Sequence, residues 1–132
     1  MAEKVAQGSC MCGSIRYEAR GDLRPLCACH CNSCRKSSGH YTAATAVKKE
    51  NLTVFGDSLK WYRADDIAER AFCSNCGSNL FYRPFNKGWT SIFSGTLDGE
   101  TGLSIESQIF VEEKGDYYEL PDVPVIQQSD LG

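Results

Sequence analysis

The eight cysteines of this 132-residue chain constrain its fold more than any other feature. They fall into three tight groups, at positions 10 and 12, at positions 27, 29, 31 and 34, and at positions 73 and 76. Eight cysteines in 132 residues lie below the ~8–10% that is typical of disulfide scaffolds. Closely spaced sulfurs suit a metal ion, which gathers several ligands around one point, whereas disulfides more often join distant segments. The spacing therefore favours metal or redox chemistry.

Length and charge exclude several classes of protein. The length suits one domain, which we expect to span residues 1–132. A net charge of −3 and a pI near 5.3 argue against nucleic-acid binding. Apolar runs stay well short of the ~20 residues that cross a bilayer, so no membrane span is expected. The first residues, MAEKVAQGSC, lack the apolar segment of a secretory signal, so we expect a cytoplasmic protein with reduced thiols.

Strand signals dominate the rest of the chain. Residues 14–18 alternate, with Ile15 and Tyr17 on one face, as a half-buried strand requires. A hairpin-like turn at residues 56–58 separates two short strands, and prolines at 121 and 124 keep the tail over 117–126 extended. Residues 31–38 form the best helical stretch, and 98–103 are a turn-rich loop. The strands expected are 14–18, 41–48, 52–55, 59–63, 79–83, 90–94 and 108–111. This pattern predicts an all-β domain.

The strongest single motif is Cys73 and Cys76 followed by Gly77. In such a turn both thiolates reach one metal, and glycine accepts the backbone conformation that follows. Cys10 and Cys12, also in a turn before a strand, are the natural source of two more ligands. Four thiolates would form a closed, structural zinc site. A thioredoxin-like redox pair is the alternative, although such pairs open a helix and this pair precedes a strand.

The central group has a different character. Cys29, Cys31 and Cys34 can place three sulfurs around one zinc ion from a single loop, which leaves a coordination position open. An open position is typical of a catalytic zinc, because substrate or water must bind there. The alternative is a second closed site, in which Cys27 is the fourth ligand.

Charged and titratable neighbours surround this group. Arg35 and Lys36 follow the last sulfur and either offset the charge of the thiolates, hold a substrate carboxylate, or are solvated surface cations. His30 lies between two ligands, so we expect its ring to point away from the metal and make a polar contact. His40 is either a turn residue at a strand edge or a fourth ligand or proton carrier.

Three motifs together resemble one known family. Residues 8–17, GSCMCGSIRY, are similar to the opening motif of the family of glutathione-dependent formaldehyde-activating enzymes and centromere protein V. Residues 29–39, CHCNSCRKSSG, and 70–80, RAFCSNCGSNL, resemble its next two motifs. Residues 95–98 and 109–111 resemble later landmarks, so the resemblance runs in order over a core of about residues 8–124. Cys27 and the Tyr117-Tyr118 pair depart from the usual family pattern.

The resemblance implies a fold and an activity. The implied fold is the β-tent, an all-β zinc architecture with one short helical turn. The implied activity is that of a carbon–sulfur lyase that joins glutathione, or another small thiol, to formaldehyde or a related aldehyde. The implied cofactors are one structural and one catalytic-type zinc ion. The implied ligands are Cys10, Cys12, Cys73 and Cys76 for the structural ion and Cys29, Cys31 and Cys34 for the catalytic one.

Two other functions compete with the enzyme. A non-catalytic, zinc-stabilised binding module is one, although relatives of that kind carry basic, proline-rich extensions and this chain is acidic. A thiol or metal sensor is the other, in which Cys27 pairs reversibly with a cysteine of the central group. The enzyme hypothesis alone predicts a cleft beside Cys34.

Overall fold

The structure, a computed structural model, describes residues 4–131 and divides into two compact units. The first unit holds residues 4–24 and 45–102, and the second holds residues 25–44 and 103–131. Within the described residues the chain forms ten strands and a single short α-helix, so the all-β prediction is confirmed. None of the helices in the described range has the length and apolar character that a membrane crossing needs.

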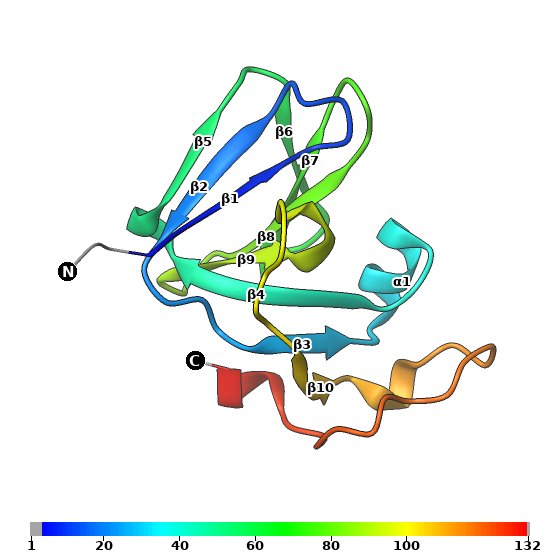
Figure 1. The fold of residues 1–132 in the computed structure, drawn as a ribbon. Helices are drawn as coiled ribbons and strands as arrows, with labels where there is room; N and C mark the ends of the chain where they lie inside the picture. Colours follow the sequence, from blue (N-terminus) through cyan, green and yellow to red (C-terminus); the bar gives the residue numbers. More distant parts are fainter. Residues whose placement is uncertain (1–3, 132) are drawn as a thin grey trace. The chain divides into compact units, whose positions relative to one another are not determined.

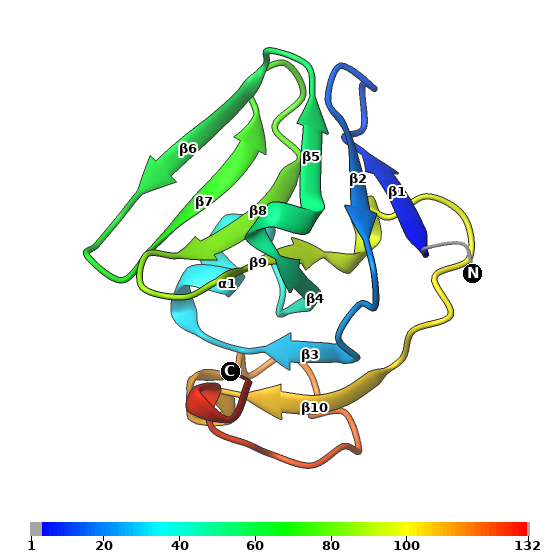
Figure 2. The ribbon, with the colours of Figure 1, turned by 90° about the vertical axis from the view of Figure 1, so that its left-hand side faces the viewer.

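The first unit contains a small antiparallel sheet in the order β1-β2-β5. Its strands are β1 (Val5–Ser9), β2 (Arg16–Arg20) and β5 (Leu52–Phe55), which lie side by side in Figure 2. The alternation predicted for this segment is confirmed, because Ile15 and Tyr17 are both buried. The strand begins at Arg16, two residues later than expected, because the residues before it form the turn that carries the first cysteine pair.

A second set of strands completes the first unit. β9, β8, β7 and β6 pair in that order and are antiparallel throughout, with the end of β4 beside β9 (Figure 1). Their bounds are Thr42–Lys48 for β4, Leu59–Arg63 for β6, Ala68–Cys73 for β7, Asn79–Pro84 for β8 and Trp89–Phe93 for β9. Two 3₁₀ turns, Lys49–Asn51 and Ser94–Thr96, follow β4 and β9.

The expected hairpin around residues 56–58 is wrong. β5 pairs with β2, and β6 pairs with β7, so the two strands join different sheets. Gly56 has a φ of 113°, and a Cβ at this position would collide with the carbonyl oxygen of Ser14. The turn therefore packs against the segment before β2 instead of folding β6 back onto β5.

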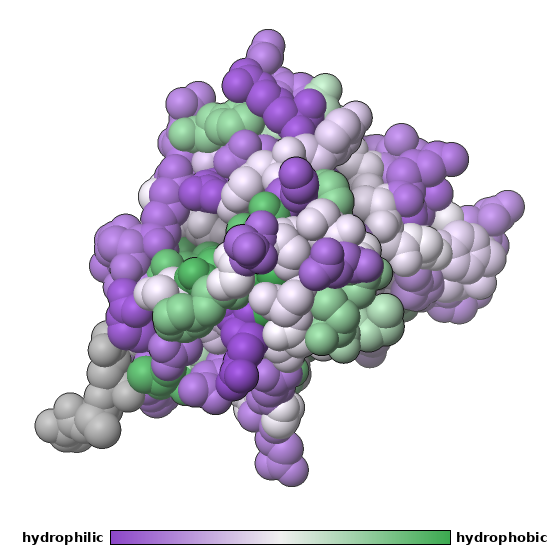
Figure 3. Space-filling view, turned by 90° about the horizontal axis from the view of Figure 1, so that it is seen from above, coloured by the Kyte–Doolittle hydropathy of each residue, from purple (hydrophilic) through white to green (hydrophobic). Residues whose placement is uncertain are grey.

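The core of the first unit lies between these strands. Tyr17 and Phe81 meet edge to face, with ring centroids 5.0 Å apart, and the sulfur-bearing side chains of Cys10 and Cys73 belong to the same buried cluster. In Figure 3 the hydrophobic side chains of the described residues on the viewed face form small groups that hydrophilic side chains separate. The core cluster that holds Cys10 and Cys73 also contains the largest fully buried apolar side chains of this unit, Tyr17, Phe81, Ile15, Leu80 and Ile92.

A close approach between β1 and β2 gives a test of this packing. The Tyr17 ring lies across Gly8, and its hydroxyl is 2.7 Å from Thr96 Oγ1. A Cβ at Gly8 would overlap the ring, so we expect Gly8→Ala to reduce the free energy of unfolding by about 1–3 kcal/mol. Gly88→Ala is the matched control, because no atom lies within 4 Å of a Cβ there. Equal denaturation midpoints for the two variants would contradict this packing.

The second unit is built around β3 (Leu26–Cys29). β10 (Ile105–Ile109) runs parallel to β3, and the first part of β4 runs antiparallel to it. The expected strand over 108–111 thus starts earlier and stops at Ile109, because Phe110 adopts a left-handed conformation with φ 56°. The tail over 117–126 forms no helix, as the prolines predict, but it is extended only in part, with a turn at Tyr117, bends at Tyr118 and at residues 122–123, and a β-bridge between Val125 and Gln108. The helix α1 (Asn32–Ser38) follows β3, and 3₁₀ turns occupy Val111–Glu113 and Gln128–Leu131.

Candidate metal centres

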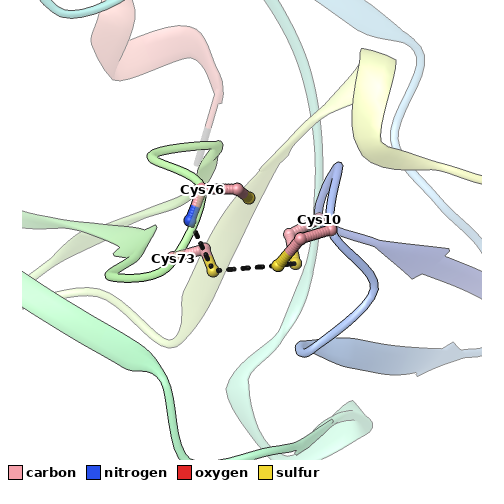
Figure 4. Close-up of side chains that lie close together, drawn as sticks. Cys10, Cys73 and Cys76 are labelled. Carbon is pink, nitrogen blue, oxygen red and sulfur yellow. Dashed lines mark hydrogen bonds between the residues drawn. The ribbon is translucent and has the colours of Figure 1, made fainter.

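The first unit brings four cysteine sulfurs to one point. The sulfurs of the first and third sequence groups all lie within 4.8 Å of one another. Figure 4 shows Cys73 at the end of β7 and Cys76 on the turn that follows, pointing toward Cys10 on the segment after β1. The sulfurs of Cys12 and Cys73 are 3.8 Å apart. We call these four residues, Cys10, Cys12, Cys73 and Cys76, the quartet; four sulfurs at this spacing can hold one metal ion.

The two halves of the quartet share a local structure that the sequence encodes twice. Each half ends in Cys-Gly-Ser, and the glycines, Gly13 and Gly77, have φ values of 80° and 81°. The serine that follows turns back toward the cysteine, so that Ser14 Oγ is 3.1 Å from Cys12 Sγ and Ser78 Oγ is 3.2 Å from Cys76 Sγ. The repeated serine is the sequence signal for these sulfur contacts, which the spacing of the cysteines alone does not indicate.

Hydroxyl and amide donors favour the thiolate at two members of the quartet, Cys73 and Cys76, whereas the pKa of Cys12 is raised although hydrogen bonds from Ser14 act to lower it. Hydrogen bonds from Ser14 and then Ser58 lower the pKa of Cys73 to about 5, although burial opposes the shift. The hydroxyl and amide of Ser78 lower the pKa of Cys76 to about 7. The backbone N–H of Ile15 also donates to Cys10 Sγ at 3.3 Å. Thiolate is the form that binds a metal, so the environment fits the proposed ligand set.

The redox alternative finds less support. The eight cysteines all lie in the described residues, and none of them is in a disulfide. Cys73 and Cys76 occupy a turn between two strands, whereas a redox pair of the thioredoxin kind opens a helix. The C-x-x-C pair therefore provides two of the four sulfurs of the quartet.

The second unit brings together three sulfurs, those of Cys29, Cys31 and Cys34, again within 4.8 Å of one another. We call these three residues the trio. The first ends β3, the second is the N-cap of α1, and the third lies in the first turn of the helix. The N–H of Cys34 donates to Cys31 Sγ at 3.3 Å, so one ligand also caps the helix that carries another. α1 ends at Gly39, whose φ is 88° and whose N–H bonds to the carbonyl oxygen of Arg35.

In the trio the resolved pKa shifts are all upward, whereas the quartet contains two cysteines with a lowered pKa. The pKa of Cys29 is raised far above its ordinary value because its proton is held by the thiols of Cys31 and Cys34 and because the site is buried. The pKa of Cys31 is also raised, although a hydrogen bond from Cys29 acts to lower it. Three crowded sulfurs resist losing all their protons unless a cation compensates the charge. A bound dication supplies that charge, so the donor set fits a metal ion.

Cys27 lies outside both groups. It is buried on β3, and the three-sulfur group that includes Cys29 does not extend to it. The alternative of a second closed site with Cys27 as fourth ligand therefore has no support in this geometry.

The two histidines have different surroundings. His30 is fully buried, and its ring nitrogens lie 2.8 Å from Tyr118 Oη and 2.9 Å from Gln108 Oε1. The expected polar contact is confirmed. Burial lowers the pKa of His30, although the Gln108 bond opposes the shift. His40 is exposed, and its Nδ1 is 3.3 Å from Tyr117 Oη.

The two cations that follow the trio also differ. Arg35 is half-buried, and its Nε donates to the carbonyl oxygen of Glu113 at 3.0 Å. The Glu113 carboxylate accepts from the N–H of Asn32 at 3.0 Å, so this glutamate ties the segment after β10 to both ends of the first helical turn. Lys36 is exposed and has no ion pair among residues 4–131. Arg35 is thus partly used in holding the fold, and Lys36 is available to a ligand.

A cavity of about 370 Å³ lies on the small sheet of the first unit. Its lining includes Arg16, Glu18, Phe55 and Asp98, and no cysteine contributes to it. The cleft expected beside Cys34 stays a prediction.

Comparison with known proteins agrees with this geometry. A crystal structure of a Rhodobacter sphaeroides protein has a similar fold, with a TM-score of 0.62 and 23% identity over 73% of this chain and 91% of that one. An uncharacterized lyase of Schizosaccharomyces pombe is 28% identical over 115 residues, which cover 86% of this chain and 83% of the relative. The sequence model of one family matches residues 5–113, which include every cysteine of the quartet and the trio. The chain belongs to the family of glutathione-dependent formaldehyde-activating enzymes.

Proposed function

We propose that this protein is a zinc-dependent carbon–sulfur lyase that catalyses the reversible addition of glutathione, or another small thiol, to formaldehyde or a related aldehyde. The observation that carries the proposal is that one chain gathers its sulfurs in two groups of different size, four and three. Membership of the family and the lyase name of the fission-yeast relative support the reaction class.

The two groups suit different roles. Four thiolates complete the tetrahedral coordination of zinc, so we assign the quartet to a structural ion that joins the segment after β1 to the turn after β7. Three thiolates leave one position of a tetrahedron for substrate, so we assign the trio to the catalytic ion. A zinc ion held by Cys29, Cys31 and Cys34 would supply the positive charge that stabilises a substrate thiolate at neutral pH.

The reaction needs one proton to move and one bond to form. The substrate thiol loses its proton, and the thiolate sulfur attacks the carbonyl carbon of the aldehyde. As the C–S bond forms, the π electrons of the carbonyl move to oxygen, which takes up a proton and becomes a hydroxyl group. A free thiol has a pKa near ~8.5 and is mostly protonated at neutral pH, so the site contributes most by favouring the thiolate.

Side chains next to the trio suit a substrate that carries carboxylates, as glutathione does. Lys36 is exposed on α1 and would attract a carboxylate as a point charge. Arg35 is held through its Nε by Glu113, which fixes the guanidinium so that its terminal nitrogens can point toward a ligand. We therefore assign Arg35 and Lys36 to substrate binding and not to the chemical step.

We also propose that residues 1–132 act as one domain and that the protein is cytoplasmic. The family match spans residues 5–113 and thus draws on both structural units. A reducing compartment would keep the seven proposed cysteine ligands as thiols.

Magnetisation-exchange NMR of glutathione and formaldehyde tests the proposal. The purified, zinc-loaded protein should accelerate exchange between free formaldehyde and its glutathione adduct beyond the spontaneous rate in the same buffer. The matched control is the same protein sample after its more labile zinc has been removed. If loaded protein and buffer give equal exchange rates, the proposed reaction is wrong for this substrate pair.

A further inference from the structure

His30, which lies between two cysteines of the trio, is held from three directions. Its backbone N–H donates to the carbonyl oxygen of Ile109 at 3.2 Å, and both of its ring nitrogens have partners. The imidazole is fully buried in the second unit. A buried ring whose polar atoms all form hydrogen bonds is held in one orientation.

The neighbouring backbone determines the direction of these bonds. The side-chain amide nitrogen of Gln108 donates to the carbonyl oxygens of Pro121 and Val123, at 2.9 and 3.0 Å. The amide group is therefore oriented with its oxygen toward His30, where it can only accept. His30 Nε2 must carry the proton that is donated to Gln108 Oε1, at 2.9 Å.

The position of the proton on His30 also determines the direction of its hydrogen bond with Tyr118. With its proton on Nε2, a neutral imidazole has an acceptor at Nδ1, so the hydroxyl of Tyr118 donates to it at 2.8 Å. The same hydroxyl accepts from the N–H of Gly115 at 3.3 Å. Lys114 Nζ donates to the carbonyl oxygens of Gly115 and Tyr118, which fixes the turn that carries this tyrosine.

We infer that His30, Gln108 and Tyr118 are positioning residues that hold the trio in its metal-binding geometry by anchoring its loop to the C-terminal segment. We call this chain of bonds the His30 relay. The inference rests on the proposed function, in that it takes the trio to be a metal site. It adds a role for residues 114–123, which follow the matched family range of 5–113.

The ring of His30 and the sulfurs on either side of it have different partners. The sulfurs of Cys29 and Cys31 belong to the trio, whereas the ring between them bonds to β10 and the tail. Fixing the ring on one side of this extended segment therefore fixes the two sulfurs on the other. A ligand set that is already positioned loses less conformational entropy when it binds a metal.

The coupling must act in both directions. If order in the tail favours metal binding at the trio, metal binding at the trio favours order in the tail by the same factor. Gln108 is the point of contact, because its backbone N–H donates to the carbonyl oxygen of Pro124 while its side chain holds Pro121 and Val123. Metal loading should thus protect the amides of residues 114–126 from exchange with solvent.

Tyr118→Phe tests the relay because it removes the hydroxyl and keeps the ring. We expect it to weaken zinc binding at the trio by about 10-fold, the low end for outer-shell substitutions around metal ligands. Competition with a chromophoric chelator measures the zinc affinity of the trio in protein whose quartet stays loaded. The thiolate-to-cobalt absorption of protein with Co²⁺ at the trio is a second measurement of the same site. Tyr117→Phe is the matched control, since within residues 4–131 that hydroxyl hydrogen-bonds to His40 and Gly39 and not to His30, and the side chain is exposed.

The outcomes separate the two proposals. If wild-type protein binds one zinc ion only, the trio is not a metal site and the proposed function is wrong. If wild type binds two and the Tyr118 and Tyr117 variants have the same trio affinity, the His30 relay has no positioning role. Hydrogen exchange of wild type provides an independent test: unchanged protection of residues 114–126 on loading the trio overturns the inference even if Tyr118→Phe does not fold.

Discussion

The Cys73→Ser variant is expected to lose the folded state of the protein and the tightly bound zinc ion together. Cys73 is fully buried, belongs to the core cluster of the first unit and contributes one of the four quartet sulfurs. Structural zinc contributes on the order of 10–16 kcal/mol to folding in small zinc domains, which is comparable with the ~5–15 kcal/mol net stability of an ordinary domain. Circular dichroism and metal analysis of the purified variant give the result.

Cys27→Ser is the matched control for this substitution. It makes the same chemical change at another buried cysteine, but Cys27 belongs to neither sulfur group. We expect it to lower the free energy of unfolding by about 1–2 kcal/mol, within the ordinary range for a buried site, and to keep both zinc ions. A Cys73→Ser protein that folds as well as Cys27→Ser would show that the quartet does not support the fold.

Sequence patterns predicted those parts of the fold that depend on local alternation. The strands over 52–55 and 59–63 have the predicted bounds, and the helix at the trio begins within one residue of its expected start. β7 was missed because Glu69 and Arg70 interrupt its apolar pattern. Their partners lie on β8, where Glu69 is 3.7 Å from Arg83 and Arg70 lies over the Tyr82 ring. Partners that a neighbouring strand supplies to charged side chains cannot be recognised from the local sequence.

Pairing between strands that lie far apart in the chain is the second feature that local sequence patterns could not predict. β3 was missed because it has only four residues, three of them small and none part of a clear alternation. Its parallel neighbour β10 lies almost eighty residues further along the chain, and β5 and β6 separate into different sheets although three residues divide them. Register and strand order follow from such long-range packing and not from local propensity.

The grouping of cysteines could be inferred from spacing, whereas the environment of the sulfurs could not. The structure brings together the same four and the same three cysteines that the spacing indicated, and metal binding by them stays a prediction. The hydroxyl of Ser58, which helps to lower the pKa of Cys73, comes from a distant turn. The relay partners of His30, Gln108 and Tyr118, are 78 and 88 residues away from it.

Cys34→Ser is expected to abolish the acceleration of thiol–aldehyde exchange while the protein stays folded. The substitution leaves two trio sulfurs, and serine oxygen is a poor ligand for zinc, so the labile zinc ion should be lost. The quartet lies in the other unit and keeps its four sulfurs. The backbone N–H of Cys34, which donates to the N-cap Cys31, is retained by serine, so α1 keeps its capping bond.

Magnetisation-exchange NMR, metal analysis and a thermal unfolding curve on one sample separate the possible causes of a lost activity. One zinc ion per chain, an unfolding temperature close to that of Cys27→Ser and an exchange rate equal to buffer would locate catalysis at the trio. Loss of the folded state would instead make the trio a second structural site. Full activity with a single bound zinc ion would exclude the trio from the reaction, because the variant would then react without the zinc ion of the trio.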